Sequence, residues 1–363
     1  MAIEKALYTN GADTPTAEEI EIEIVNPEEV TISTDDMELS MGFDEEPMAE
    51  HDSNLVDFME QSELDTLGSE LVGLYNADKT SRHDWEESYI KGLDLLGMKF
   101  EERTTPWDGA CGVFHPMLSE AVVRFQSQTI MEIFPASGPA KTTIIGKLTD
   151  EKVKQAQRVQ EYLNYMMTVK MPEYRTETEK LLFSLPIAGS AFRKVYYDPN
   201  LGRACSMFVP AADFVVSYGA ADLETAERAT HVMKMEANDV LKLQQSGFYA
   251  DVELPAPAPD TTEISAKYNK LTGDHPSYEV DQRHTLLEMM VNVDLPGFED
   301  LDNSEPTNIG LPYIITVDKS SNIILSIRRN WKEEDALKLK RQHFVHYQYL
   351  PGLGFYGFGL IHM

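Results

Sequence analysis

The stretch EKLLFSLPIAGSAFRKVYYDP, residues 179–199, contains the point at which the hydrophobic pattern of this chain changes. Before it, apolar residues recur every three or four positions, as on one face of a helix; after Gly189 they alternate with polar residues, as in a strand with one buried face. Pro186 and Gly189 separate the two patterns, and both residue types favour the end of a helix. The stretch predicts that a helical region ends at Pro186 and that a β-rich region follows.

Helical periodicity recurs upstream of this stretch. The loop PWDGACGVFHP, residues 106–116, interrupts it, because two prolines and two glycines disfavour regular structure. Thr149 or Asp150 is a suitable N-cap for the third helix. We expect helices over residues 64–97, 117–134, 151–169 and 173–185.

Alternation with period two dominates the sequence downstream. Asn238 is expected to cap one short helix, and residues 255–281 read as a long Pro-rich loop. The expected strands are AFRKVYYDP, MFVPAADFVVSY, HVMKME, LLEMMVNVDL, LPYIITVDKSSNIILSIRRNW and HFVHYQYLP. The sequence thus predicts an α+β fold, with a helical part over residues 64–186 and a mainly antiparallel β part over residues 187–363.

The negative charge is concentrated at the N-terminus. Residues 1–70 contain 21 Asp or Glu and a single Lys, although the whole chain has 61 acidic and 31 basic residues. Like-charge repulsion and the lack of a sustained apolar face predict a disordered acidic tail over residues 1–54. The alternation in residues 19–25 leaves open an edge strand that pairs with a partner.

Composition excludes several classes of protein. A formal charge of −30 argues against a surface that holds nucleic acid by neutralising phosphates. Two cysteines cannot form a disulfide framework, and neither a membrane span nor a signal peptide is visible in the sequence. We expect an intracellular chain that is neither exported nor embedded in a membrane.

Three glycines near the end of the sequence have the spacing of a dinucleotide-binding turn. Gly352, Gly354 and Gly357 follow a predicted strand, but no helix, second strand or ribose-binding acid comes after them here. We interpret them as a glycine-rich bend. The pair Gly146–Lys147 lacks the other residues of a phosphate-binding loop, which argues against an ATP-driven motor.

No group of residues predicts a catalytic or metal site. His343 and His346 are three apart in a predicted strand, so their side chains are expected on opposite faces. No serine lies in a G-x-S-x-G turn, and neither Cys111 nor Cys205 has a nucleophile signature. We predict no catalytic, cofactor-binding or metal-binding residues and no enzymatic activity. A hydrolase with a site assembled from distant residues is the weakest alternative.

The remaining candidates have structural interpretations. The acidic pair Glu86–Glu87 is typical of a solvated helix face, and the pairs Met166–Met167 and Met289–Met290 of a core. One basic cluster comprises Arg328, Arg329, Lys332, Lys338, Lys340 and Arg341. It is compatible with a contact to nucleic acid or to an acidic neighbour, and equally with a charged hairpin and its solvated flank.

Four stretches in the same order carry a resemblance over residues 84–363. They are PWDGACGVFHPMLSEAVVRFQSQTIMEIFPASGPAKT, MPEYRTETEKLLFSLPIAGSAFRKVYYDP, FVPAADFVVSYGAADLETAERATHV and LPGLGFYGFGL. Together they resemble portal proteins, the head-to-tail connectors of tailed bacteriophages, particularly the short-tailed type.

The resemblance implies a dodecameric ring at one capsid vertex, with the α+β part similar to the wing region of such subunits. It implies a channel for packaging and ejecting double-stranded DNA without sequence-specific binding. The implied partners are the major capsid and scaffolding proteins, the terminase packaging motor and tail adaptor proteins. The implied location is the virion, and the host cytoplasm during assembly. Portal subunits are usually longer, so we also expect that the chain is truncated after Met363.

An alternative from another class is a scaffold or capsid-associated adaptor of a phage. Such a protein would recruit a basic partner through the acidic tail. Neither hypothesis requires a cofactor or a membrane.

Overall fold

The computed structural model describes residues 21–26, 29–34, 37–42, 50–96, 104–105, 107–110, 112, 115–198, 201–258, 262–272, 283–302 and 305–363. It divides the chain into two units, residues 1–50 and 51–363. In the first unit, β1 (Glu21–Asn26), β2 (Glu29–Thr34) and β3 (Met37–Gly42) form an antiparallel sheet in that order.

Residues 21–25 of the alternating segment, for which the sequence leaves open an edge strand, lie in β1 at the edge of this sheet and pair with β2 of the same chain. The prediction of a disordered tail over residues 1–54 falls mostly outside the described residues. The second unit begins at His51, and Asn54 is buried there with its side chain bonded to Leu325 O and Ile327 N. Residues 51–54 therefore belong to the folded body, which begins earlier than we expected.

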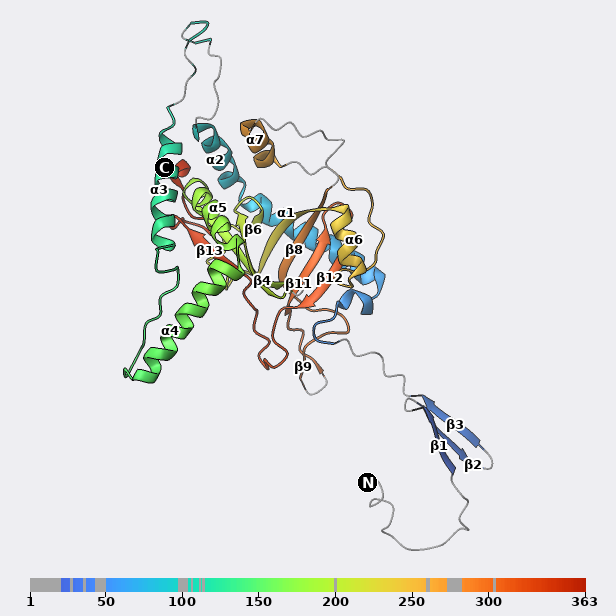
Figure 1. Ribbon diagram of the computed structural model, residues 1–363. Helices are drawn as coiled ribbons and strands as arrows, with labels where there is room; N and C mark the ends of the chain where they lie inside the picture. Colours follow the sequence, from blue (N-terminus) through green and yellow to red (C-terminus); the bar gives the residue numbers. More distant parts are fainter. Residues whose placement is uncertain are drawn as a thin grey trace. The chain divides into compact units, whose positions relative to one another are not determined.

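Two antiparallel sheets form the centre of the second unit, and its fold is α+β (Figure 1). The five-stranded sheet has the order β12-β11-β8-β7-β6, and the three-stranded sheet the order β13-β4-β5. Their strands are β4 (Ser190–Asp198), β5 (Arg203–Pro210), β6 (Phe214–Val216), β7 (Arg228–Glu236), β8 (Arg283–Val293), β11 (Leu311–Asp318), β12 (Ile324–Arg329) and β13 (Phe344–Gln348). The short strands β9 (Leu301–Asp302) and β10 (Glu305–Pro306) pair separately.

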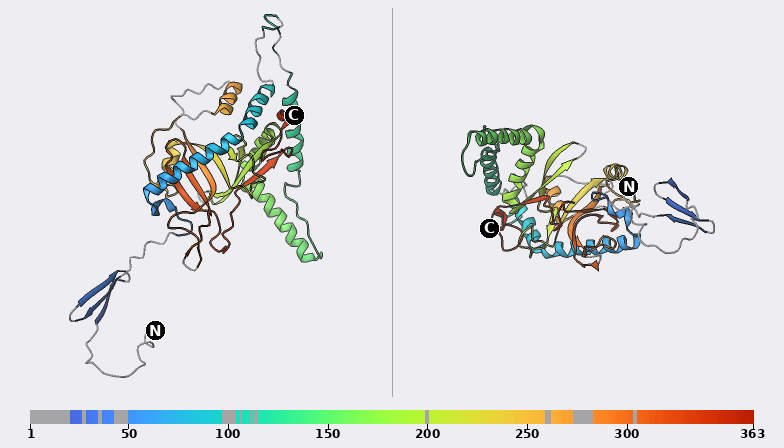
Figure 2. Two further views of the ribbon diagram at one scale, coloured as in Figure 1. Left: turned by 180° about the vertical axis from the view of Figure 1, so that it is seen from behind. Right: turned by 90° about the horizontal axis from the view of Figure 1, so that it is seen from below.

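Helices cover these sheets. Figure 2 shows α1 (Gln61–Ser81) crossing one face of the five-stranded sheet. The buried residues of α1 include Leu64, Leu71 and Tyr75, which recur at helical spacing. The three-stranded sheet packs against α5 (Glu173–Ala188), which in turn contacts α3 (Met117–Ile133). The remaining helical segments are η1 (Leu55–Phe58), α2 (His83–Leu93), η2 (Asp94–Leu96), α4 (Asp150–Tyr165), η3 (Met166–Lys170), α6 (Ala237–Gln245), α7 (Glu263–Thr272) and η4 (Leu360–His362).

The helical and β-rich parts share one core. A single buried cluster combines Trp85 and Leu93 of α2 with Phe192 of β4, Phe214 of β6 and Phe344 of β13. The boundary that we drew at residue 186 therefore marks a change of secondary structure within one unit.

The turn at residues 186–190 corrects one prediction. The helix does not end at Pro186 but continues to Ala188, with Pro186 inside its last turn. Proline removes one helical hydrogen bond, but Leu185, Ile187 and Ala188 are buried around it, and tertiary packing fixes the turn. Gly189 then takes the left-handed conformation, with a φ of 80°, and ends the helix as expected.

Three further predictions need correction. The helix expected from residue 64 to residue 97 breaks at Arg82 into α1 and α2, with η2 following. The N-cap of α6 is Glu236, so Asn238 lies inside the first turn and caps nothing. The segment predicted as a loop over residues 255–281 contains α7. The predicted cap of α4 is confirmed, because Thr149 Oγ1 accepts a hydrogen bond from Lys152 N.

Candidate functional site

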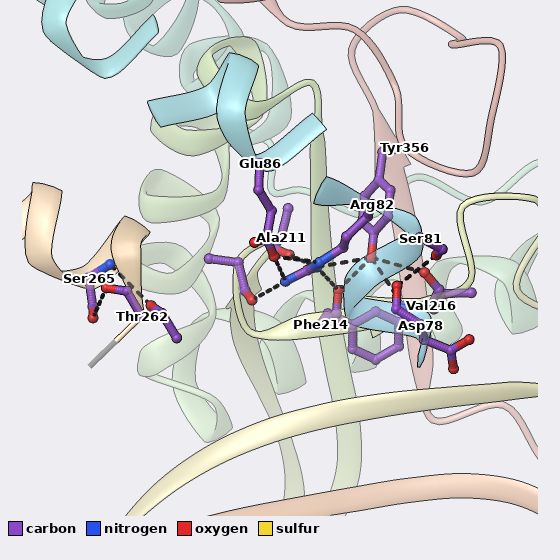
Figure 3. Close-up of polar contacts among 11 residues, drawn as sticks. Asp78, Ser81, Arg82, Glu86, Ala211, Phe214, Val216, Thr262, Ser265 and Tyr356 are labelled. Carbon is purple, nitrogen blue, oxygen red and sulfur yellow. Dashed lines mark hydrogen bonds and ion pairs between the residues drawn. The ribbon is translucent and has the colours of Figure 1, made fainter. Parts of the chain in front are cut away.

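A buried arginine connects the break between α1 and α2 to distant parts of the chain (Figure 3). The side chain of Arg82 is 2% exposed and donates to the carbonyl oxygens of Ala211, Ala212 and Phe214 at 2.8–2.9 Å. It also donates to the hydroxyl of Tyr356 at 3.0 Å and pairs with Glu86 at 2.8 Å. The planar guanidinium of Arg82 has five N–H donors, and these satisfy carbonyl oxygens of residues 211–214 that the loop itself would leave without a hydrogen-bond partner.

Aromatic side chains surround this arginine. The ring of Trp85 stacks on Tyr356 at 4.7 Å, and the guanidinium of Arg82 lies over both rings. The hydroxyl of Tyr356 in turn donates to Phe214 O at 2.9 Å. We call this group, Arg82, Trp85, residues 211–214 and Tyr356, the Arg82 joint.

The glycine-rich bend packs beside the Arg82 joint. A Cβ on Gly354 would lie 2.6 Å from the ring of Tyr218, and one on Gly357 would lie 2.5 Å from Gly189 O. These glycines permit close contact between the end of the chain and the turn at residue 189. They serve packing, in agreement with the interpretation as a bend. Parts of the three resembling stretches that begin at residues 171, 208 and 350 therefore meet at one place.

A cleft of about 880 Å³ lies between α5 and α7. Asp213 of the β5–β6 loop is part of its lining, so the cleft adjoins the Arg82 joint. Figure 3 shows Thr262, which precedes α7, and Ser265 of α7 on the opposite side of this view from Tyr356. The apolar residues that line the cleft include Leu96, Phe183, Ile187, Val232, Ile264 and Leu271. A groove between two helices with apolar walls has the form that accepts an amphipathic helix.

Asp213 is, with Glu179, one of two described acidic residues that line this cleft. Among the described residues, none donates a hydrogen bond to its carboxylate. The surrounding protein desolvates the carboxylate and raises its pKa, and the nearby cationic groups, including Lys234 and Arg82, oppose that shift. On the same side, the hydroxyl of Tyr268 contacts that of Tyr89, and burial raises the pKa of both. The cleft thus combines apolar side chains with a carboxylate acceptor, and polar residues, including Lys180 and Lys234, also line it.

A second surface lies on α4 and the segment before it, which extend away from the sheets (Figure 1). We call residues 138–170 the arm. None of the side chains of α4 is buried, and Val159, Tyr162 and Leu163 are 45%, 61% and 41% exposed. The segment before the helix covers only one face, through bonds from Ala140 N to Asn164 and from Thr142 N to Gln160.

The basic cluster of the sequence is used largely within the chain. Arg328 donates to Asp52 O and Phe248 O, and Arg329 donates to His51 O, so both hold the start of the folded body. Lys338 pairs with Asp300, and Lys340 donates to Leu223 O and Ala226 O. The structure therefore favours the charged-hairpin interpretation of these four residues.

The two histidines have separate partners. His343 Nε2 lies 3.0 Å from Asn330 Oδ1, and His346 Nε2 lies 3.0 Å from Ser190 Oγ. His346 is stacked on Phe192 and Phe355, and burial lowers its pKa to about 4. Both side chains have packing roles. No group of three potential metal ligands occurs within the part of the chain that the structure describes.

The other sequence candidates are spread over the body. Glu86 pairs with Arg82 of the Arg82 joint, whereas Glu87 pairs with Lys91 on the solvated side of α2. Met289 and Met290 are core residues, and Met166 and Met167 of η3 are half-buried. Cys205 is buried, and burial raises the pKa of its thiol; Cys111 and Gly97 lie outside the described residues.

Sequence reasoning missed the Arg82 joint, the cleft and the exposed face of the arm. The spacing of Val159, Tyr162, Leu163 and Met166 was a usable signal for the arm, but no local pattern indicates what Arg82 or Asp213 contacts. None of the helices in the described segments is long and apolar enough to span a bilayer. Comparison with models of known protein families gives no match, and comparison with curated proteins gives none either.

Proposed function

We propose that this chain is a subunit of a tailed-bacteriophage portal, which acts by assembling into a ring and not by catalysis. The single observation that carries the proposal is the arm. Val159, Tyr162 and Leu163 lie 41–61% exposed on a helix with no buried side chain. An apolar helix face of this kind indicates an interface with another protein.

The resemblance to portal proteins suggests which contact this interface makes: the contact between neighbouring subunits of a ring. Parts of the three stretches around the Arg82 joint are distant in sequence yet pack together, as expected if they belong to one structural element of the family. A ring of portal subunits requires a heterologous interface that closes by rotation, so each subunit must present two different surfaces. The arm and the cleft are two such surfaces.

Charge also supports a channel subunit. A DNA conduit should not hold its cargo through many phosphate contacts, because each contact adds salt-dependent affinity. The formal charge is −30, and four cations of the basic cluster bind within the chain. Double-stranded DNA passing without specific binding is consistent with both facts. Capsid and scaffolding proteins, the terminase motor and tail adaptors are the proposed partners, and the virion is the proposed location.

Electron microscopy of the purified full chain tests this proposal. We expect rings with a central hole and twelvefold symmetry, and a sedimentation coefficient far above that of a 41.0 kDa monomer. A chain that stays monomeric at all concentrations would overturn the proposal.

The adaptor hypothesis is the second candidate, because the strongly acidic N-terminus largely forms a unit of its own. Deleting residues 1–49 separates the two functions. Rings that persist while a basic capsid partner no longer binds would assign recruitment to the first unit. Loss of the rings would instead assign that unit a role in assembly.

A further inference from the structure

We propose that the arm of one copy docks in the cleft of the adjacent copy, with the α4 helix lying between α5 and α7 of its neighbour. This inference rests on the proposed ring and identifies its two contact surfaces. Both surfaces include several apolar side chains, neither is filled by the described residues, and they differ in shape: one is a ridge on a helix and the other a groove between helices.

The ridge has the residue spacing of a helix that binds in a groove. Val159, Tyr162, Leu163 and Met166 are at positions i, i+3, i+4 and i+7, so they form one strip along α4 and the start of η3. The opposite wall of the contact would be the apolar lining of the cleft, including Phe183 of α5 and Leu271 of α7. Burial of this strip removes apolar surface from water on both copies.

The arm does not reach the cleft of its own chain. Figure 1 shows α4 leaving the first turn of α5 and pointing away from α7. The segment from Met166 to Lys170 is a π-helix in which Met171 N donates to Met166 O at 2.9 Å, and this turn fixes the direction of the arm. An arm that docks in this cleft would therefore come from another molecule, and the same direction would let copies connect head to tail.

Charge favours a second copy of this chain as that molecule. Residues 138–170 contain six Lys or Arg and three Asp or Glu, although the chain as a whole has a formal charge of −30. A basic arm on an acidic protein is attracted to other copies of it. Lys152 lies on the ridge, seven residues before Val159, and in the docked arm it would face the cleft carboxylates Glu179 and Asp213, beside the cations that also line the cleft.

Cross-linking between copies tests this contact. Gln155 lies on the ridge without being one of its apolar residues, and Ser184 of α5 lines the cleft. The full chain with Cys111→Ser and Cys205→Ser, carrying in addition both Gln155→Cys and Ser184→Cys, should give a ladder of covalent oligomers with a short bismaleimide. Each single variant should give no ladder, and neither should Lys154→Cys combined with Ser184→Cys, because residue 154 lies on another side of the helix.

A second variant separates assembly from folding. Leu163→Asp should raise the concentration needed for half-maximal ring formation by at least about tenfold, since it places a carboxylate in an apolar groove. It should leave the circular dichroism and thermal unfolding of the monomer unchanged, because Leu163 is not part of the core. Gln157→Asp, an equivalent charge on an exposed position outside the ridge, is the matched control and should assemble normally.

The outcomes distinguish the two proposals. If Leu163→Asp forms rings normally and the double cysteine variant gives no ladder, the docking of the arm is overturned and the portal proposal stands. A ladder without closed rings would support the docking and overturn the portal function. Absence of both rings and ladder would overturn both.

Discussion

The Arg82 joint and the arm are both organised around helices with apolar faces, yet the chain completes only one of them. At the Arg82 joint, Trp85 is 6% and Tyr356 1% exposed, and the arginine between them donates to three carbonyl oxygens and a hydroxyl. In the arm, no side chain of α4 is buried. The difference shows that amphipathic periodicity predicts a helix but does not indicate whether its apolar face is covered within the chain or by another molecule.

Substituting one arginine in each region should give the largest difference in the free energy of unfolding between the Arg82 joint and the arm. Arg82→Ala should lower the free energy of unfolding by about 3–5 kcal/mol, because it leaves buried carbonyls without donors and Glu86 without its partner. Arg158→Ala in the arm should change it by less than about 0.5 kcal/mol, since Arg158 is exposed. Urea unfolding at a concentration where the chain is monomeric measures both. Equal effects would mean that the Arg82 joint does not hold the body together.

The second comparison is of the pH dependence of stability, between Glu288 in the body and Glu161 in the arm. Glu288 is bonded to Lys194 at 2.6 Å and to His231 at 3.0 Å. Burial alone would raise its pKa, but the hydrogen bond from His231 and the charge of Lys194 outweigh burial and lower the pKa to about 2. Because the folded-state pKa lies below the ordinary value of 4.5, the stabilisation is present above pH 4.5 and is lost as the pH falls toward 2.

Glu288→Gln should therefore be less stable than the parent chain near pH 7, by about 3 kcal/mol. This difference should shrink between pH 4.5 and 2, as measured by urea unfolding at a series of pH values. The control Glu161→Gln, at an exposed carboxylate that accepts a hydrogen bond from Gln157, should follow the parent chain at every pH. A Glu288→Gln profile parallel to that of the parent would show that this carboxylate does not cause the acid sensitivity.

The smallest expected difference in stability is between alanine substitutions at two glycines with positive φ. Gly189, with φ +80°, would place a Cβ 2.2 Å from Gly357 O, whereas Gly146, with φ +99°, has nothing within 4 Å of that position. Gly189→Ala should cost about 2 kcal/mol or more in thermal unfolding, from the backbone conformation and the clash together. Gly146→Ala should cost at most about 1 kcal/mol, because only the conformational term remains. Similar losses would show that the bend tolerates displacement.

Local residue chemistry accounts for the predictions that the structure confirms. The α+β class, the change at Gly189, the cap at Thr149 and most strands follow from periodicity and turn residues, which act within a few positions of the sequence. The helix end at Pro186 could not be located from propensity alone, because the last turn of α5 is buried against residues from elsewhere in the chain. At Asn238 the structure places the helix start two residues earlier, at Ala237 after Glu236, and nothing in the burial of that turn explains the shift.

The sequence by itself determined that this chain has helices followed by strands, a strongly acidic N-terminus and a glycine-rich bend near residue 354. Only the tertiary structure decided that Arg82 joins residues 211–214 to Tyr356, that Asp213 faces a cleft, and that the face of α4 around Leu163 is uncovered. The physical reason is range: backbone preferences depend on adjacent residues, whereas the burial and hydrogen bonding of these side chains depend on other segments of the chain, which for Arg82 are more than a hundred positions away.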